Sequence, residues 1–296
     1  FETIRRTGPD KETIYTCYVM DENRKLEGIV TVKDLLLSDM DARIGDIMDT
    51  QARYVSTDED KEAIANIFQK YDFLSLPVVD RERRLVGIIT IDDAVEVLQQ
   101  ENTEDFELMA AVTPSEAPYL KTGVFSHAKR RVVWLLLLML ASALAGAILT
   151  RFQDAFAVMP ILVSFIPMLM NTGGNCGSQA STLIIRGLAV GEIEIKDYFK
   201  IVFKELRVAS ICGLVLGIAN IIRMYLFCDG TLEVFLVVSL AMFCAIVVAK
   251  LIGCSLPIFA KIVKLDPALM AGPMIATLVD IVTLVIYFGL AKAFLL

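Results

Sequence analysis

The chain has 296 residues, and 56% of them are hydrophobic, which exceeds the roughly 45–50% of an average soluble domain. Its formal net charge is −7, and the sequence lacks the basic surface that a nucleic-acid partner requires. An acidic chain favours cations as partners. Six cysteines form no CxxC pair, and the single histidine excludes a His-rich zinc, nickel or copper cluster.

The apolar residues are concentrated in the C-terminal half. Residues 1–130 are rich in charge with short apolar runs, whereas long apolar runs begin at Arg131. The sequence therefore predicts one aqueous part and one part in lipid. The chain begins with Phe1 and shows no cleavable signal, so we expect a trimmed chain whose N-terminal half lies in the cytosol.

The aqueous part contains an internal repeat, in which residues 18–34 resemble residues 76–93. Each copy predicts a strand, a turn, a second strand and a helix that begins at a Thr-x-x-Asp cap. This is the pattern of a CBS-domain pair. We expect a partial first module over 1–40, without its opening strand and helix, and a second module over 41–98 with an amphipathic helix at 61–71.

An acidic helix is predicted over 92–110, and it runs from the second module into a connecting segment and linker over 99–130. The segment 127–131 is basic and is followed by Trp134, a combination typical of a membrane interface. Residues 131–296 are predicted to form a five-span domain, with spans at about 132–150, 156–185, 206–227, 232–256 and 268–294. The bias of Lys and Arg toward one side predicts a cytosolic N-terminus and an external C-terminus.

The second predicted span is interrupted by the polar run 171–181, which holds three glycines and follows Pro160 and Pro167. Irregular backbone at membrane depth is tolerated only inside protein or beside a wet cavity, so the run predicts a broken helix facing an ion. The alternative is close helix packing through small residues, as favoured for 141–146 in the first span.

Asp280 is the only carboxylate in the middle of a predicted span, and no basic residue of that helix can pair with it. A charge there costs ~3 kcal/mol, which indicates an ion path; the alternative is a protonated, hydrogen-bonded Asp280. Lys250 is expected to extend toward the cytosolic interface. Mg²⁺ prefers octahedral oxygen ligands, which Asp280 and the polar run supply. No nucleophile and base pair appears in the spans, so no enzyme is predicted.

The chain resembles the MgtE family over essentially its whole length. The resemblance rests on the CBS pair, the acidic helix, the five spans, the long motif 167–183 and the sequence from Asp266 to Asp280. It implies an α-helical membrane protein with five transmembrane helices per protomer behind an α/β CBS pair. It also implies a Mg²⁺-selective channel or transporter in the cytoplasmic membrane, with its pore on the axis of a homodimer. The implied pore residues are Asp280, Asn175, Ala276, Asn171 and Gly174. Gly272 departs from relatives that have Asn before the proline, so one ligand is expected to be missing or replaced.

The resemblance further implies gating by cytosolic Mg²⁺ at acidic faces of the CBS and connecting parts. The matching positions are Asp60, Glu62, Asp72, Asp93, Glu96, Glu101, Glu104, Asp105 and Asp266. Without the resemblance, these acidic positions are equally typical of ordinary solvated helix faces.

CBS pairs often bind ATP or another adenine nucleotide. Candidates here are Thr31, Asp34, Phe73, Thr90 and Asp93, although the Thr and Asp residues also make good helix caps. Two other functions remain open: a less selective Co²⁺ or Mn²⁺ transporter, and a nucleotide-sensing membrane protein.

Overall fold

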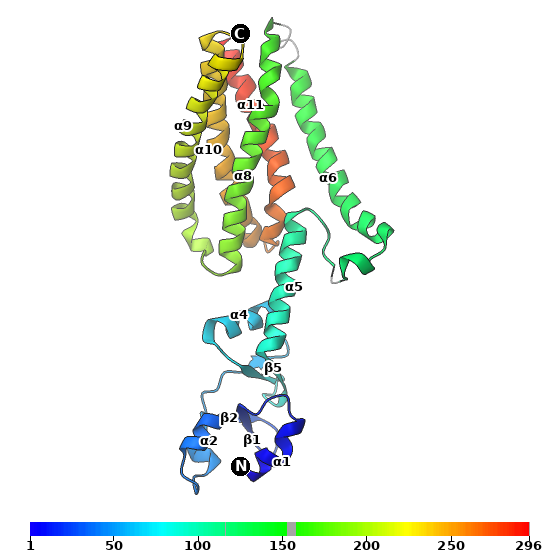
Figure 1. Cartoon of the computed structure of the whole chain (residues 1–296), viewed down its shortest axis with the longest axis vertical. Coiled ribbons are helices and arrows are strands. Elements are labelled where there is room, and N and C mark those ends of the chain that lie inside the picture. The colour runs from blue at the N-terminus through cyan, green and yellow to red at the C-terminus, as the bar shows by residue number, and fades with distance from the viewer. Residues whose placement is uncertain (116, 153–157, 296) are drawn as a thin grey trace. The chain divides into compact units, whose positions relative to one another are not determined.

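The computed structural model describes residues 1–115, 117–152 and 158–295. The predicted start of the second span at 156 lies outside these residues. The chain divides into two compact units, Phe1–Asn102 and Thr103–Leu296 (Figure 1).

The first unit contains two similar modules. Their elements are α1 (Glu2–Thr7), η1 (Gly8–Asp10), β1 (Thr16–Met20), β2 (Leu26–Thr31) and α2 (Val32–Leu37), then α3 (Ile44–Ile47), β3 (Val55–Ser56), α4 (Lys61–Tyr71), β4 (Ser75–Val79), β5 (Leu85–Thr90) and α5 (Ile91–Met109). β1 pairs with β2 in antiparallel fashion, and the second sheet has the order β3-β4-β5, in which β3 and β4 are parallel. α5 continues into the second unit.

The repeat corrects one expectation about the first module. β1 and β4 begin 59 residues apart, at Thr16 and Ser75, and α1 and α4 begin with the same offset at Glu2 and Lys61. α1 therefore occupies the place of the module's first helix. The prediction that the chain lacks this helix is wrong, because the short charged stretch before the first strand was not read as helical.

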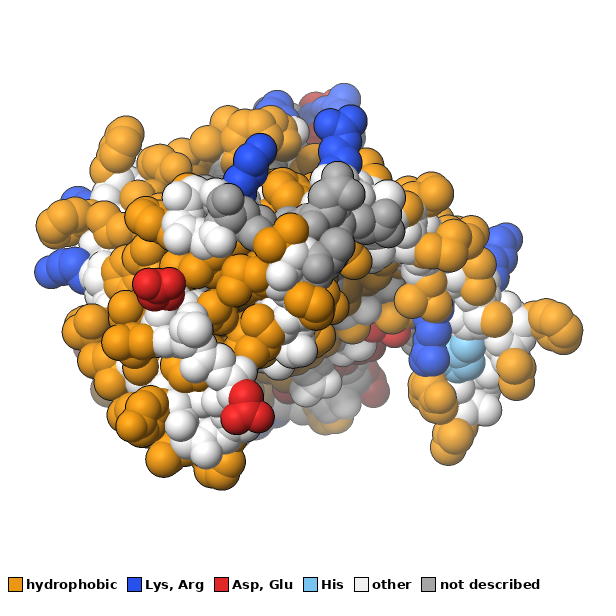
Figure 2. Space-filling model, turned by 90° about the horizontal axis from the view of Figure 1, so that it is seen from above, with side chains coloured by type: hydrophobic (Ala, Val, Ile, Leu, Met, Phe, Trp, Pro, Cys, Tyr) orange, Lys and Arg blue, Asp and Glu red, His pale blue; other side chains and the backbone are white. Residues whose placement is uncertain are grey.

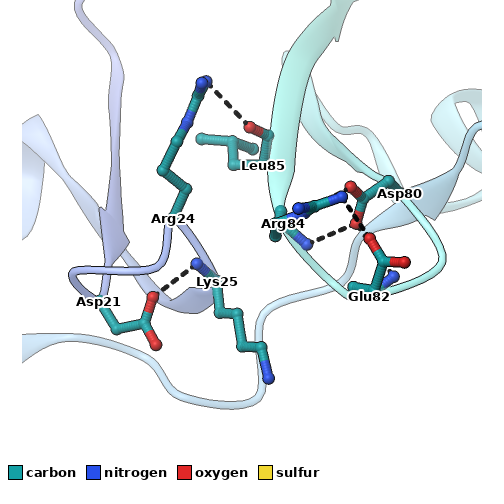
Figure 3. A network of polar contacts seen from close by, with 7 residues as sticks. All are labelled: Asp21, Arg24, Lys25, Asp80, Glu82, Arg84 and Leu85. Atoms are coloured by element: carbon teal, nitrogen blue, oxygen red, sulfur yellow. Dashed lines mark hydrogen bonds and ion pairs between the residues drawn. The ribbon is translucent and has the colours of Figure 1, made fainter.

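The two modules are joined at their turns. Arg24 and Arg83 are equivalent, and both have a φ of 64°. The backbone N–H of Leu85 donates to the carbonyl of Arg24 at 2.8 Å, and that of Leu26 donates to the carbonyl of Arg83 at 3.1 Å. Figure 3 shows this junction, where the Arg24 guanidinium also donates to the Leu85 carbonyl at 3.3 Å. This exchange makes the modules one unit.

The Thr-x-x-Asp segments cap their helices as predicted. The Thr31 side chain accepts from the Asp34 N–H, and the Asp34 carboxylate accepts from the Thr31 N–H and hydroxyl. Thr90 and Asp93 repeat the arrangement. These hydrogen bonds from threonine lower the pKa of both aspartates, so both caps are ionised at neutral pH.

The second unit is helical. Its elements after α5 are η2 (Tyr119–Lys121), α6 (Val124–Arg151), η3 (Pro160–Phe165), α8 (Ile166–Ala189), η4 (Ile195–Asp197), α9 (Tyr198–Phe227), α10 (Leu232–Ile262), η5 (Pro267–Met270) and α11 (Gly272–Phe294). α8, α10 and α11 pack on one another, while α9 packs on α10 and α6 on α11. The core includes Leu162, Leu169 and Ile246, and the Tyr287 hydroxyl donates to the Leu162 carbonyl at 2.8 Å.

Within the described residues, four helical segments are long and apolar enough to cross a membrane: α6, η4 with α9, α10 and α11. α8 is excluded by its polar run, so the count of five spans stays a prediction. Apolar side chains cover much of the unit's surface in Figure 2, and those of α6, such as Leu135 and Leu140, are more than half exposed. This surface suits contact with lipid.

The polar run does not break the second span. Residues 171–181 lie inside the continuous helix α8, so the prediction of a broken helix is wrong. The irregular backbone lies earlier, because Pro160 opens η3 and Pro167 stands in the first turn of α8, where a missing N–H costs no helical hydrogen bond.

Lys250 does not extend to the interface. Its side chain is 6% exposed, and its Nζ lies 3.7 Å from Oε2 of Glu205, which is itself 13% exposed. Glu205 was placed outside the predicted third span, but α9 begins at Tyr198 and includes it. The two opposite charges allow both residues to be buried.

We predict that Lys250→Met destabilises the protein by about 3–5 kcal/mol, because it leaves the Glu205 carboxylate buried without a cation. The double variant Lys250→Met/Glu205→Gln should recover most of this loss. Denaturant unfolding of the purified protein in detergent measures both. Equal stability of the single variant and the wild type would show that the charges are not coupled.

Candidate ion pathway and nucleotide cavity

The glycines of the polar run provide close helix contacts. An added methyl group at Gly177 would lie 2.8 Å from Cγ2 of Ile275 on α11 and 3.2 Å from the carbonyl of Ala249 on α10. At Gly173 it would lie 2.8 Å from Oγ1 of Thr283 on α11. The packing alternative therefore explains these glycines, since a side chain at either position would separate the helices.

Two serines of the same run tie α8 to the segment before α11. The Ser178 hydroxyl donates to the Gly272 carbonyl at 3.4 Å, and the buried Ser181 hydroxyl donates to the Met270 carbonyl. These bonds satisfy carbonyl groups where η5 ends and α11 begins.

The asparagines behave differently from the glycines and serines. Asn171 and Asn175 are exposed, one turn apart on α8, and Nδ2 of the Asn175 side chain donates to Oδ1 of the Asn171 side chain at 3.4 Å. Most of their hydrogen-bonding capacity is unused among the residues that the structure describes. Exposed amides on a helix packed among apolar helices require water, an ion or another protein surface beside them.

Asp280 lies against α8 at Gly174, and Gly174 stands between the two asparagines in the sequence. An added methyl group on Gly174 would lie 3.4 Å from Cβ of Ala276 and 3.9 Å from Oδ1 of Asp280. Asp280 is partly buried, and within the described part of the chain it has no ion-pair partner. The structure thus brings together Gly174, Ala276 and Asp280 and places the asparagines on the same stretch of α8.

Gly272 has a local reason to be glycine. Its φ is +29°, and an added methyl group would lie 3.0 Å from the Met109 carbonyl at the end of α5. The departure noted in the sequence therefore coincides with a tight approach of two backbone segments.

Several of the acidic residues predicted to sense Mg²⁺ instead cap helices or pair with residues close to them. Asp60 and Asp266 cap α4 and η5, Glu101 pairs with Lys61 at 2.9 Å, and Glu96 accepts from Gln100 at 3.3 Å. Among the described residues, no three His, Cys, Asp or Glu side chains come together in a metal-binding group. The single chain thus does not bring the predicted sensing residues to one site.

A cavity of about 660 Å³ opens in the first unit. Two of the nucleotide candidates, Thr31 and Phe73, line it, but Asp34, Thr90 and Asp93 do not. The lining residues that sequence analysis missed include Tyr15, Tyr18, Arg53, Asp72 and Pro77. Arg53 stacks on Tyr71, with its guanidinium carbon 3.8 Å from the ring centroid.

A second cavity, of about 380 Å³, lies at the equivalent place in the repeat. Ile14 and Ile88 line it where Phe73 and Ile29 line the first, with the same offset of 59 residues. The second cavity differs from the first in its smaller volume and in having Ile14 where the first has the aromatic ring of Phe73.

We predict that Gly177→Ala destabilises the protein by about 1–3 kcal/mol, because its methyl group meets Ile275 and the Ala249 backbone. Gly289→Ala is the matched control in α11, where no atom lies within 4 Å, and should be neutral or slightly stabilising. Denaturant unfolding in detergent compares them. A Gly177→Ala variant as stable as Gly289→Ala would contradict the close contact.

Comparison with known proteins agrees with this architecture. Residues 166–290 match the MgtE family model, described as a divalent cation transporter, and residues 1–41 and 44–100 match the CBS domain. The magnesium transporter MgtE of Thermus thermophilus is 38% identical over 99% of this chain and 64% of its own length. The magnesium transporter MgtE of Bacillus subtilis is 34% identical over 96% of this chain and 62% of its own length.

A solved structure of the cytosolic domain of the Mg²⁺ channel MgtE in complex with ATP is 47% identical, covering 32% of this chain and 39% of that chain, with a TM-score of 0.32. The chain spans somewhat less than two thirds of the length of the curated relatives. Those that match nearly the whole chain are transporters and not enzymes, as expected from the sequence. With an MgtE domain behind a CBS-domain pair, the chain belongs to the MgtE family.

Proposed function

We propose that this chain is the CBS and pore portion of a Mg²⁺-selective channel or transporter that imports Mg²⁺ across the cytoplasmic membrane. The proposal rests on the position of Asp280, a carboxylate in the middle of α11 that lies against Gly174 and Ala276 without an ion-pair partner among the described residues. Its N-terminal unit is proposed to be cytosolic and its C-terminus external.

The donor set suits a small hard cation. A carboxylate oxygen at Asp280 and amide oxygens at Asn171 and Asn175 are oxygen ligands, and the described part of the chain offers no group of cysteine and histidine there. Mg²⁺ gives up its water reluctantly, so one carboxylate and a few amide or carbonyl oxygens suffice to hold a largely hydrated ion. Ala276 and Gly174, which have little or no side chain, let α8 approach α11 closely beside Asp280.

We propose a homodimer with the pore between the two copies. Asn171 and Asn175 are exposed in the single chain, and exposed amides at membrane depth are costly unless they face water or protein. A second copy placed on this face would bring two Asp280 carboxylates toward one axis.

Regulation by cytosolic Mg²⁺ is proposed for the acidic residues of the first unit and of α5. Since the chain by itself forms no metal-binding group of three such residues among those described, each site requires a carboxylate from another segment or copy. A bound cation between such carboxylates would offset their repulsion and favour the closed arrangement.

We predict that Asp280→Asn lowers Mg²⁺ flux by about tenfold or more, because a neutral amide attracts the cation less. Flux is measured into proteoliposomes containing a Mg²⁺-sensitive dye, with Asp229→Asn as the control carboxylate outside the helices. Full flux through Asp280→Asn would refute the role of Asp280. Equal flux of Co²⁺ or Mn²⁺ in competition would favour the less selective transporter.

We also propose that the larger cavity of the first unit binds an adenine nucleotide. The cavity combines aromatic rings, for stacking of a base, with Thr31, Lys33 and Arg53 as polar and basic groups for ribose and phosphate. The smaller cavity has Tyr18 as its single aromatic lining residue, so it offers less surface for stacking of a base.

Tyr15→Ala is expected to weaken ATP binding by about 1–3 kcal/mol, because Tyr15 lines the larger cavity and is largely exposed, so its loss should not disturb the core. Ile14→Ala, at the adjacent position, lines the smaller cavity and serves as the control. Isothermal titration calorimetry of the whole chain measures both. Weaker binding in the Ile14 variant alone would assign the nucleotide to the smaller cavity instead.

A further inference from the structure

We propose that Glu107 and Arg130 are positioning residues for the mouth of the ion pathway. They hold the C-terminal end of α5 against α8 and the start of α11. This inference rests on the proposed function, because it concerns how the same pathway is closed.

The two residues form an ion pair through one guanidinium nitrogen of Arg130. Nη2 of Arg130 donates to both carboxylate oxygens of Glu107 at 2.8 Å. The Arg130 side chain is 13% exposed and that of Glu107 is 28% exposed. Arg130 was expected to be part of a basic membrane anchor, whereas here its charge is matched within the protein. Such a partly buried, charge-assisted pair is stronger and more directional than a surface pair.

Further hydrogen bonds fix the chain between the two residues. The Arg130 Nε donates to the Thr113 carbonyl at 2.6 Å, and the Ser115 N–H donates to Glu107 Oε2 at 2.8 Å. α5 ends in a left-handed turn at Ala111, with a φ of 55°. There the Val112 N–H donates to the Glu107 carbonyl and the Ala111 N–H to the Leu108 carbonyl, as in a Schellman cap. α5 is thus fastened to the start of α6.

The C-terminal end of α5 contacts α8 and the segment where α11 begins, and these are the two helices that carry the candidate site. Leu108 and Met109 pack against Ile185 of α8, against Ala268 of η5 and against Ala271, which follows η5. The Met109 carbonyl is also the atom that approaches Gly272. From Gly272, where α11 begins, Asp280 is eight residues away, which is about 12 Å along a helix.

This arrangement links α5, α6 and the start of α11 mechanically. When a cation stabilises one position of α5, the ion pair carries that preference to the contact at Gly272. Without the pair, the turn at 110–115 can absorb the displacement. A ligand shifts a conformational equilibrium only by its differential binding to the two states, so a loose α5 end weakens inhibition.

The test is Mg²⁺ inhibition of flux in proteoliposomes, with the variants Glu107→Gln, Arg130→Gln and their combination. We expect each single variant to raise the half-inhibitory Mg²⁺ concentration by about fivefold or more, with a maximal rate near that of the wild type. The double variant should show no larger shift than either single variant, because all three lose the same contact. Lys121→Gln, an exposed basic residue nearby, is the control.

Unchanged inhibition curves in the single variants, or shifts that add in the double variant, would overturn the proposal. Hydrogen exchange of residues 106–115 in the whole chain gives a readout independent of transport, and it should quicken in each single variant. Absence of Mg²⁺ flux in the wild type would instead refute the proposed function, and exchange unchanged by the substitutions would then refute the positioning role.

Discussion

The close approach of α8 to α10 and α11 is the constraint on which the membrane part depends. Lipid supplies little hydrophobic drive for helices to associate, so contact must come from packing at short range. Gly173 and Gly177 remove the side chains that would hold α11 away, and Gly253 of α10 approaches the Gly177 carbonyl. Because these glycines fix the distance between α8 and α11, they also fix how near Gly174 of α8 lies to Ala276 and Asp280 of α11. The proposed ion site thus depends on helix packing as much as on polar chemistry.

The two units hold charge in different ways. In the first unit, carboxylates such as Asp34 and Asp93 accept local hydrogen bonds at helix caps. These caps are open to solvent, so the charged carboxylates lose little hydration there. In the second unit, the buried Glu205 is compensated by Lys250 from a neighbouring helix. Asp280 has neither kind of partner within the described residues, and it lies where α8 presents amides rather than apolar side chains. Its charge is therefore neutralised or solvated by a group other than these, which is a proton, water, a cation or a second copy.

Local sequence signals predicted the features whose causes are local. The repeat, its strands and its Thr-x-x-Asp caps depend on residues within a few positions of one another, and the isolation of Asp280 is visible in its own helix. The continuity of α8 was missed because glycines were taken as helix breakers, whereas their reason lies in Ile275 and Thr283, about a hundred residues later. The pairs Glu205 with Lys250 and Glu107 with Arg130 were missed for the same reason, since nothing near either residue announces its partner.

The pairing of Glu205 has a consequence for how long a cation stays. Conduction requires a site that attracts an ion strongly enough to admit it and weakly enough to release it. Lys250 cancels the charge of Glu205 within 3.7 Å, so the field of this pair falls off as that of a dipole. A bare carboxylate in its place would add a second well for a divalent ion inside the same helical unit and lengthen its residence. In the proposed pathway, the lysine therefore keeps Glu205 from adding a second deep well for a divalent ion beside Asp280.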